Sequence, residues 1–230
     1  MHKTAKIGLL AYPGSPLTYP TVESLQALGY KNIHIICDGD QRNEKFIQII
    51  SERTNGKAIF HQLTDFQKLG TPFYFVSNHN APECIELVRN LQLDILGSCG
   101  TPRKLNLPLL QSTHFGVINC HPGKLPQYRG SSSVEWALFN DDEIAATAHF
   151  MTEGYDEGPI IQIFPLQTKG LDYSTIRLSM IQHQAASLAA AIHSVLDKGI
   201  PATSYPPQPE GKSWPRIPDD KMRSLLSRRF

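Results

Sequence analysis

The first 120 residues alternate between short apolar runs and longer segments with helical periodicity, and this alternation constrains the fold more than any other feature. Continuous apolarity is typical of strands that are buried on both faces of a sheet. Strands that alternate with helices are joined by right-handed crossovers into a parallel sheet. We therefore predict an α/β fold, with a mostly parallel twisted sheet and helices on both faces. The predicted strands are "AKIGLLAY" (5–12), "NIHIICD" (32–38), "PFYFVSN" (72–78), "LDILGSCG" (93–100) and "FGVINC" (115–120).

The pattern changes after residue 144. Two β-rich runs, "IAATAHFM" and "GPIIQIFPLQ", flank the turn-prone "TEGYDEG" and predict an antiparallel extension of the sheet. An Ala- and Leu-rich segment from Tyr173 to Gly199 predicts a C-terminal helix that ends at the glycine. Residues 201–230 are rich in proline, and we expect them to form an arm packed on an α/β domain of residues 1–200.

Composition and cysteine spacing argue against several classes of partner. Lys and Arg number 22 against 21 Asp and Glu, so the net charge of +1 gives no reason to expect a nucleic acid or a membrane surface as partner. The four cysteines are widely spaced without a CxxC pair, which argues against a zinc site or a disulfide framework and suits a reducing compartment. Because the chain also lacks a signal-peptide pattern and a run of membrane-spanning length, we expect a cytoplasmic protein without a metal.

The chemistry concentrates in "GVINCHPGKLPQYRGSSS", residues 116–133. Asn119 and His121 end a predicted strand two residues apart, so in extended backbone their side chains leave on the same face. Ligands of open parallel sheets bind at the carboxyl ends of the strands. An amide donor and an imidazole placed there can stabilise an oxyanion and move a proton, as acyl transfer requires. Asp156, in a glycine-flanked turn, can orient the imidazole. The neighbouring Cys99 and Cys120 are expected to be small buried residues rather than nucleophiles.

"NCHPGKLPQYRG" together with "HFMTEGYDEGPII" resembles the 10-formyltetrahydrofolate-dependent formyltransferase family. The likeness covers residues 70 to 165 well, and the chain is nearest in kind to small free-standing N-formyltransferases such as the nucleotide-sugar enzymes. It implies a Rossmann-like formyltransferase fold, 10-formyltetrahydrofolate as the formyl donor, and transfer to a primary amine. The matching signature residues are Asn119, His121, Leu125, Pro126, Gly130 and Asp156.

The resemblance also implies roles for individual residues. Asn119 would donate to the formyl oxygen, His121 would share that stabilisation, and Asp156 would orient His121 or a water and receive the proton from the amine. His149 would support Asp156. The folate would be held largely by backbone groups of two segments, with the side-chain role of Arg103 left open. These segments supply Ser98, Thr101, Pro102, Arg103, Lys104, Leu105, Thr152, Glu153, Gly154 and Tyr155. Contacts to the acceptor are expected from Tyr12, Gly14, Ser15, His79, Tyr128, Arg129 and Gly130.

Departures from the family pattern bear on the acceptor. Methionyl-tRNA formyltransferases carry a further C-terminal barrel, where this sequence has a helix and a proline-rich arm. Glycinamide ribonucleotide enzymes have a Gly-Ser-Asn phosphate loop after the first strand. Here "AYPGSPLTYP" lacks that asparagine, and its prolines remove backbone donors. A nucleotide-linked amino sugar is therefore the first choice of acceptor. Glycinamide ribonucleotide or another small amine, a 10-formyltetrahydrofolate hydrolase and a catalytically silent folate-binding relative stay open. A homodimer is an expectation that only the resemblance carries.

Overall fold

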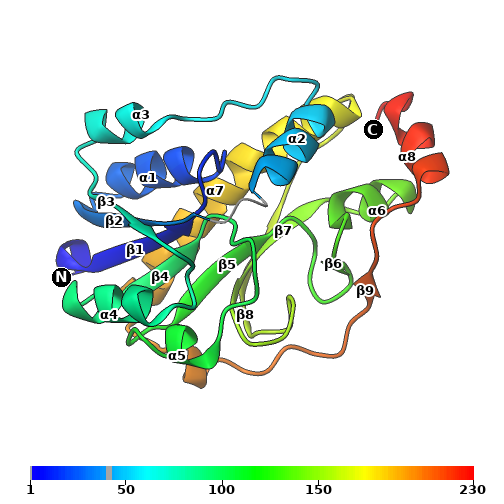
Figure 1. Cartoon of the computed structure of the whole chain (residues 1–230). Helices are drawn as coiled ribbons and strands as arrows, with labels where there is room; N and C mark the ends of the chain where they lie inside the picture. The colour runs from blue at the N-terminus through cyan, green and yellow to red at the C-terminus, as the bar shows by residue number, and fades with distance from the viewer. Residues whose placement is uncertain (1, 40–42) are drawn as a thin grey trace.

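A seven-stranded sheet forms the centre of the computed structural model, which describes residues 2–39 and 43–230 (Figure 1). The strand order is β3-β2-β1-β4-β5-β7-β8. The first five of these strands run parallel, and β7 and β8 continue the sheet in antiparallel fashion. The fold predicted from the alternation of strands and helices is confirmed, including the extension after residue 144. The bounds are β1 Lys6–Ala11, β2 Asn32–Asp38, β3 Phe73–Val76, β4 Ile95–Ser98, β5 Val117–His121, β7 Ala145–Phe150 and β8 Ile160–Pro165.

Helices cover both faces of the sheet because its central strands are apolar on both sides (Figure 1). On one face, α1 (Thr18–Ala27) packs on α7 (Tyr173–Lys198), and α7 crosses β4, β5, β7 and β8. On the other face, α4 (Pro82–Asn90) and α5 (Leu107–Leu110) pack on side chains such as Leu10 and Leu96. The predicted long helix ends at Gly199, which adopts the left-handed conformation at φ 65°.

Three further elements follow the carboxyl ends of parallel strands: α2 (Asn43–Arg53) follows β2, and β6 (Arg129–Gly130) and α6 (Ser133–Phe139) follow β5. The helix α3 (Leu63–Lys68) precedes β3, and 3₁₀ turns lie at His2–Thr4, before β1, and at Ala202–Ser204, after α7. In the part of the chain that the structure describes, no helix has both the length and the apolar character needed to cross a membrane.

The C-terminal segment is more structured than its proline content indicates. β9 (Ser213–Trp214) pairs in parallel with β6, and α8 (Asp219–Leu226) packs against α6. The helix has two aspartates in its first turn and an arginine in its last, the charge order that favours a helix. The arm therefore reaches the strand-end loops on which the candidate site is built (Figure 1).

Candidate active site

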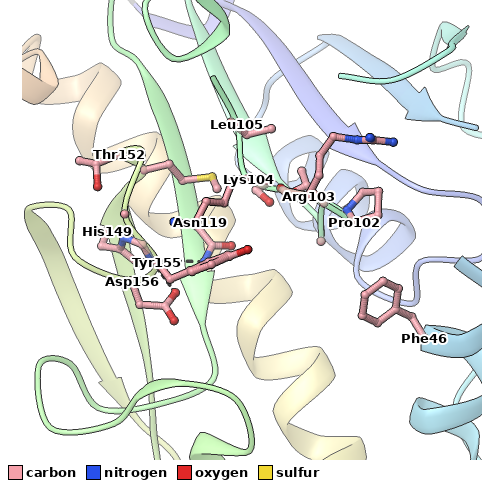
Figure 2. Close-up of a pocket in the computed structure, with 15 residues that line it drawn as sticks. Phe46, Pro102, Arg103, Lys104, Leu105, Asn119, His149, Thr152, Tyr155 and Asp156 are labelled. Carbon is pink, nitrogen blue, oxygen red and sulfur yellow. Dashed lines mark hydrogen bonds and ion pairs between the residues drawn. The ribbon is translucent and has the colours of Figure 1, made fainter. Parts of the chain in front are cut away.

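The ends of β4 and β5 border a cavity of about 330 Å³ (Figure 2). Phe46, Gly100 and Met151 line it without having been predicted; no short motif marks Phe46, whose place depends on how α2 folds over the sheet edge. Of the ten residues expected to hold folate, Glu153 lies outside the lining and nine lie within it. These nine are Ser98, Thr101, Pro102, Arg103, Lys104, Leu105, Thr152, Gly154 and Tyr155.

Asn119 and His149 face each other on the antiparallel strands β5 and β7 and are joined by a hydrogen bond. Nδ2 of Asn119 is 3.2 Å from Nε2 of His149, and Nδ1 of His149 is 2.9 Å from the carbonyl oxygen of Phe150. The carbonyl can only accept, so Nδ1 carries the proton and Nε2 accepts from the amide. Burial lowers the pKa of His149 from 6.5 to about 4, which keeps the ring neutral at pH 7. The second N–H of Asn119 remains for a ligand.

Asp156 contacts His121 and the backbone of β6. Its Oδ1 lies 3.3 Å from Nδ1 of His121, and its Oδ2 accepts the N–H of Gly130 at 2.9 Å. Nε2 of His121 is 2.7 Å from the carbonyl oxygen of Tyr128 and must therefore donate to it. Nδ1 of His121 is then the nitrogen that faces Oδ1 of Asp156. This arrangement is suited to accept a proton and return it.

The turn that carries Asp156 has a constrained backbone. Asp156 itself adopts φ 54°, in the left-handed region that aspartate tolerates better than most side chains. A Cβ atom at Gly158 would collide with the carbonyl group of Phe150. The turn is closed by a hydrogen bond of 2.9 Å from the N–H of Phe150 to the carbonyl oxygen of Pro159. These constraints aim the Asp156 carboxylate at His121.

The hydrogen bonds of His149 differ from the role that the resemblance implied. Its Nε2 accepts from Asn119 and lies 3.7 Å from Oδ1 of Asp156, beyond hydrogen-bond distance. The hydrogen bond of His149 thus goes to Asn119, and His149 lies beside Asp156 without a hydrogen bond to it.

The expected contact of His79 with the acceptor is wrong. The side chain is fully buried, with Nε2 3.0 Å from the carbonyl oxygen of Ile36, and its N–H donates to Asp38 at 3.0 Å. Arg103 covers Asp38 through two hydrogen bonds of 3.0 and 3.1 Å. Its guanidinium accordingly extends away from Asn119 and Asp156 (Figure 2). A strand-end position placed His79 at the correct edge, but the side chain points into the protein.

Three further residues expected to touch the acceptor have structural partners instead. The Ser15 hydroxyl is buried and donates to the carbonyl oxygen of Cys99 at 2.6 Å. The Tyr128 ring is buried, its hydroxyl donates to Asp142, and only its carbonyl reaches His121.

The third of these residues is Arg129, whose guanidinium donates to Gln208 and to the carbonyl of Pro209 in the arm. Gly130 contributes its N–H to Asp156. Tyr12 and Gly14 line smaller cavities beside β1 and not the one that contains Asn119. The side chains expected to contact the acceptor are therefore not assembled around Asn119, His121 and Asp156.

The thiols beside the site are poor nucleophiles. Cys99 and Cys120 are buried, and burial raises the pKa of Cys99 to about 12 and raises that of Cys120 above its ordinary value of 9. Within residues 2–39 and 43–230, no group of three or more His, Cys, Asp or Glu side chains is arranged to hold a metal ion.

Comparisons with known proteins agree with this geometry. A family model described as "Formyl transferase" matches residues 33–172. The chain is 27% identical over 175 residues to the methionyl-tRNA formyltransferase of Methylacidiphilum infernorum (isolate V4), covering 75% of this chain and 51% of that protein. The chain thus spans about half the length of this relative.

Solved structures share the fold at lower identity. Glycinamide ribonucleotide transformylase 1 from Symbiobacterium toebii superposes with a TM-score of 0.68 at 17% identity, over 91% of this chain and 96% of that one. A sugar N-formyltransferase from Shewanella sp FDAARGOS_354 superposes with a TM-score of 0.61 at 15% identity, over 91% and 76% of the two chains.

Proposed function

The chain belongs to the formyl transferase family, and from this premise we propose that it transfers the formyl group of 10-formyltetrahydrofolate to a primary amine. The observation that carries the proposal is the meeting of Asn119, His149 and Asp156 at one wall of the strand-end cavity, with His121 behind Asp156. When bound, the donor supplies an electrophilic formyl carbon.

The cavity suits a flat heterocycle with polar edges. Leu105, Met151 and Phe46 give it apolar walls. Among the described residues, the backbone N–H groups of Thr152 and Gly154 have no hydrogen-bond partner, so they can serve the polar edge of a pterin. These features support a folate donor.

In the proposed reaction Asn119 stabilises the developing negative charge, and the Asp156–His121 pair transfers the proton. The amine nitrogen forms a bond to the formyl carbon, the bond from that carbon to the donor nitrogen breaks, and one proton passes from the amine to the donor nitrogen. Asn119 donates its unused N–H to the formyl oxygen as negative charge develops there, an effect worth about a hundredfold in rate or more. Asp156 and His121 accept the amine proton and pass it on.

For the acceptor we propose a nucleotide-linked amino sugar. Support comes from the likeness in fold to a sugar N-formyltransferase and from the loop after β1, where Pro13 and Pro16 have no N–H for a phosphate. Glycinamide ribonucleotide is the second candidate. It is favoured by the likeness in fold to a glycinamide ribonucleotide transformylase, which extends over 96% of the transformylase chain. Each of these acceptors joins an amine to a phosphoryl group.

The test is incubation of the protein with 10-formyltetrahydrofolate and a panel of amines. The panel contains nucleotide-linked 4-amino and 3-amino sugars, glycinamide ribonucleotide and a blank without amine. Release of tetrahydrofolate and the mass of the formylated product are measured for the wild type and for Asn119→Ala, His121→Ala and Asp156→Asn. We expect amine-dependent turnover that falls by about a hundredfold or more in each variant.

Other outcomes separate the alternatives. Release of formate without any amine would make the protein a hydrolase. Folate binding without turnover on the whole panel would indicate a catalytically silent relative. Absence of folate binding would contradict the proposed donor.

A further inference from the structure

Glu135 of α6 is fully buried and holds two arginines from different helices. Its Oε1 lies 3.6 Å from Nε of Arg53 in α2, 3.6 Å from Nε of Arg177 in α7, and accepts the Tyr173 hydroxyl at 2.6 Å. Burial opposes the charged form of Glu135, but Arg177 and Arg53 outweigh it, and its pKa lies below the ordinary value. The cluster therefore contains two positive charges and one negative charge.

The hydrogen-bonding capacity of this cluster is not filled by the described part of the protein. Oε2 of Glu135 and Nε of Arg177 are buried without a hydrogen-bond partner there. The nitrogen of each arginine nearest to the carboxylate is Nε, and each guanidinium carries two further terminal nitrogens. One of them, Nη2 of Arg53, donates weakly to the Ser132 hydroxyl at 3.3 Å. Buried polar groups in native proteins are nearly always satisfied, so the unpaired Nε of Arg177 leaves a donor for a further partner, whereas Oε2 of Glu135 is an acceptor and cannot serve an anion.

Arg53 and Arg177 both line a second cavity of about 80 Å³, distinct from the one that contains Asn119. None of its lining residues is an aspartate or a glutamate. The remaining lining is mostly apolar or weakly polar, with Tyr12 and Gln184 as members. A small cavity with two guanidinium groups and no lining carboxylate favours an anion.

This second cavity adjoins the catalytic strand. Gly100 lines both cavities, so they meet at the loop that follows β4. Gln184 donates to the carbonyl oxygen of Cys120 at 2.7 Å, and Cys120 lies between Asn119 and His121 on β5. One small molecule can therefore place a reactive group beside Asn119 and a charged group beside the arginines.

The loop after β1 borders the same cavity but offers little to an anion. Pro13 and Pro16 have no N–H. The N–H of Ser15 donates to the carbonyl oxygen of Tyr12 at 3.0 Å, and the N–H of Leu17 donates to the Ser15 hydroxyl at 3.3 Å. Side chains rather than backbone must hold an anion here.

We propose that Arg53 and Arg177, held in place by Glu135, bind a phosphoryl group of the acceptor amine. That the phosphoryl group belongs to the acceptor amine rests on the proposed function, whereas the anion site itself rests on the geometry of the cluster. A carboxylate has two oxygens in one plane and satisfies one guanidinium fork, whereas a phosphoryl group has three oxygens and can serve two forks from different directions. Two arginines from separate helices therefore suit a phosphoryl group better than a carboxylate.

The test measures binding of inorganic phosphate by isothermal titration calorimetry, with acetate at equal ionic strength as the carboxylate arm. The variants are Arg53→Gln, Arg177→Gln and Arg177→Lys. Arg177→Lys keeps a positive charge beside Glu135 and takes the place of Arg177→Gln if that variant does not fold. Arg216→Gln, which removes one exposed arginine from the arm, is the matched control. We expect saturable phosphate binding in the wild type and in the control. We expect affinity about tenfold weaker or lost in the other variants.

Three outcomes would overturn the inference: no saturable phosphate binding in the wild type, equal binding in all variants, or acetate binding as tightly as phosphate. A second arm measures KM for the phosphorylated amine that turns over, which Arg177→Lys should raise about tenfold. The titration needs neither donor nor amine. If no amine is formylated while phosphate binding depends on the arginines, the proposed function is wrong and the anion site stands. If an amine is formylated but phosphate binding does not depend on the arginines, the proposed function stands and the anion site is wrong.

Discussion

The amide of Asn119 donates to the neutral imidazole of His149 across 3.2 Å between β5 and β7. The Phe150 carbonyl fixes the tautomer of His149, and the tautomer fixes which end of the amide faces the ring. One N–H of Asn119 is thereby held, and the other is directed at the cavity. We therefore expect His149 to act through Asn119, as a positioning residue.

A double-mutant cycle should show this dependence. Asn119→Ala should lower kcat by about a hundredfold or more, since an oxyanion donor is lost. His149→Ala should also lower kcat, but it should add little when Asn119 is already alanine, because its effect passes through the amide. The measurement is kcat for formyl transfer in both single variants and the double variant, with His114→Ala at an exposed position as the control. Fully additive losses would contradict the coupling.

Burial of His149 should make stability fall in acid. Its pKa is lowered from 6.5 to about 4 in the folded protein, so the unfolded chain binds a proton through this interval and the folded chain does not. The free energy of unfolding should therefore decrease as the pH falls from 6.5 to 4, by up to about 3 kcal/mol from this residue. Burial also lowers the pKa of His79, which acts in the same direction.

Urea unfolding at a series of pH values checks this expectation. His149→Gln should flatten the dependence between pH 6.5 and 4, and His79→Gln should flatten it separately. An unchanged slope in His149→Gln would show that His149 is protonated at its ordinary pKa in the folded state.

The sequence could predict the sheet and the strand that carries Asn119 and His121 because these depend on local pattern. Apolar runs alternated with helical segments, and Asn119 and His121 stood at the end of such a run, where ligands of parallel sheets bind. Asp156 followed from a glycine-flanked turn and a family motif. In each case neighbours in the sequence determine the position.

Partners from distant segments could not be predicted in this way. The bond between Asn119 and His149 depends on the register of β5 against β7, and the cluster around Glu135 depends on three helices that meet in space. His79 shows the same limit, since a strand-end position does not reveal that Arg103 and Asp38 cover the side chain. The proline content of the C-terminal segment likewise gave no indication of α8. Composition is an average over the whole segment, whereas the charge order that favours a helix is confined to its last part.

Chemical modification should distinguish buried thiols from a reactive one. All four cysteines are buried, and burial raises the pKa of Cys37, Cys84 and Cys99 to about 12. The thiolate is the reactive form, so iodoacetamide should leave the native protein unlabelled and its activity intact. Mass spectrometry should find four labels after unfolding in guanidinium chloride. Rapid labelling of Cys120 with loss of activity would contradict this and indicate a reactive thiol.

Gln208 of the arm joins the two segments that hold Asp156 and should position it. Its Oε1 accepts from Arg129 at 2.8 and 2.6 Å, and its Nε2 donates to the carbonyl oxygen of Gly158 at 2.8 Å. Arg129 precedes Gly130, whose N–H binds Asp156, and Gly158 closes the turn that carries Asp156. Gln208→Leu should remove both connections, lower the free energy of unfolding by about 1–3 kcal/mol and lower kcat.

Gln208→Glu separates stability from positioning. A glutamate retains the contact with Arg129 but cannot donate to the Gly158 carbonyl, so stability should be largely kept while the turn is released. We expect kcat to fall about tenfold, with folate affinity little changed, because the loss of one hydrogen bond of roughly 1 kcal/mol permits Asp156 to leave its productive position. The exposed Gln182→Ala on α7 is the matched control. Wild-type kcat in Gln208→Glu would contradict positioning of Asp156 through the hydrogen bond from the arm to the Gly158 carbonyl.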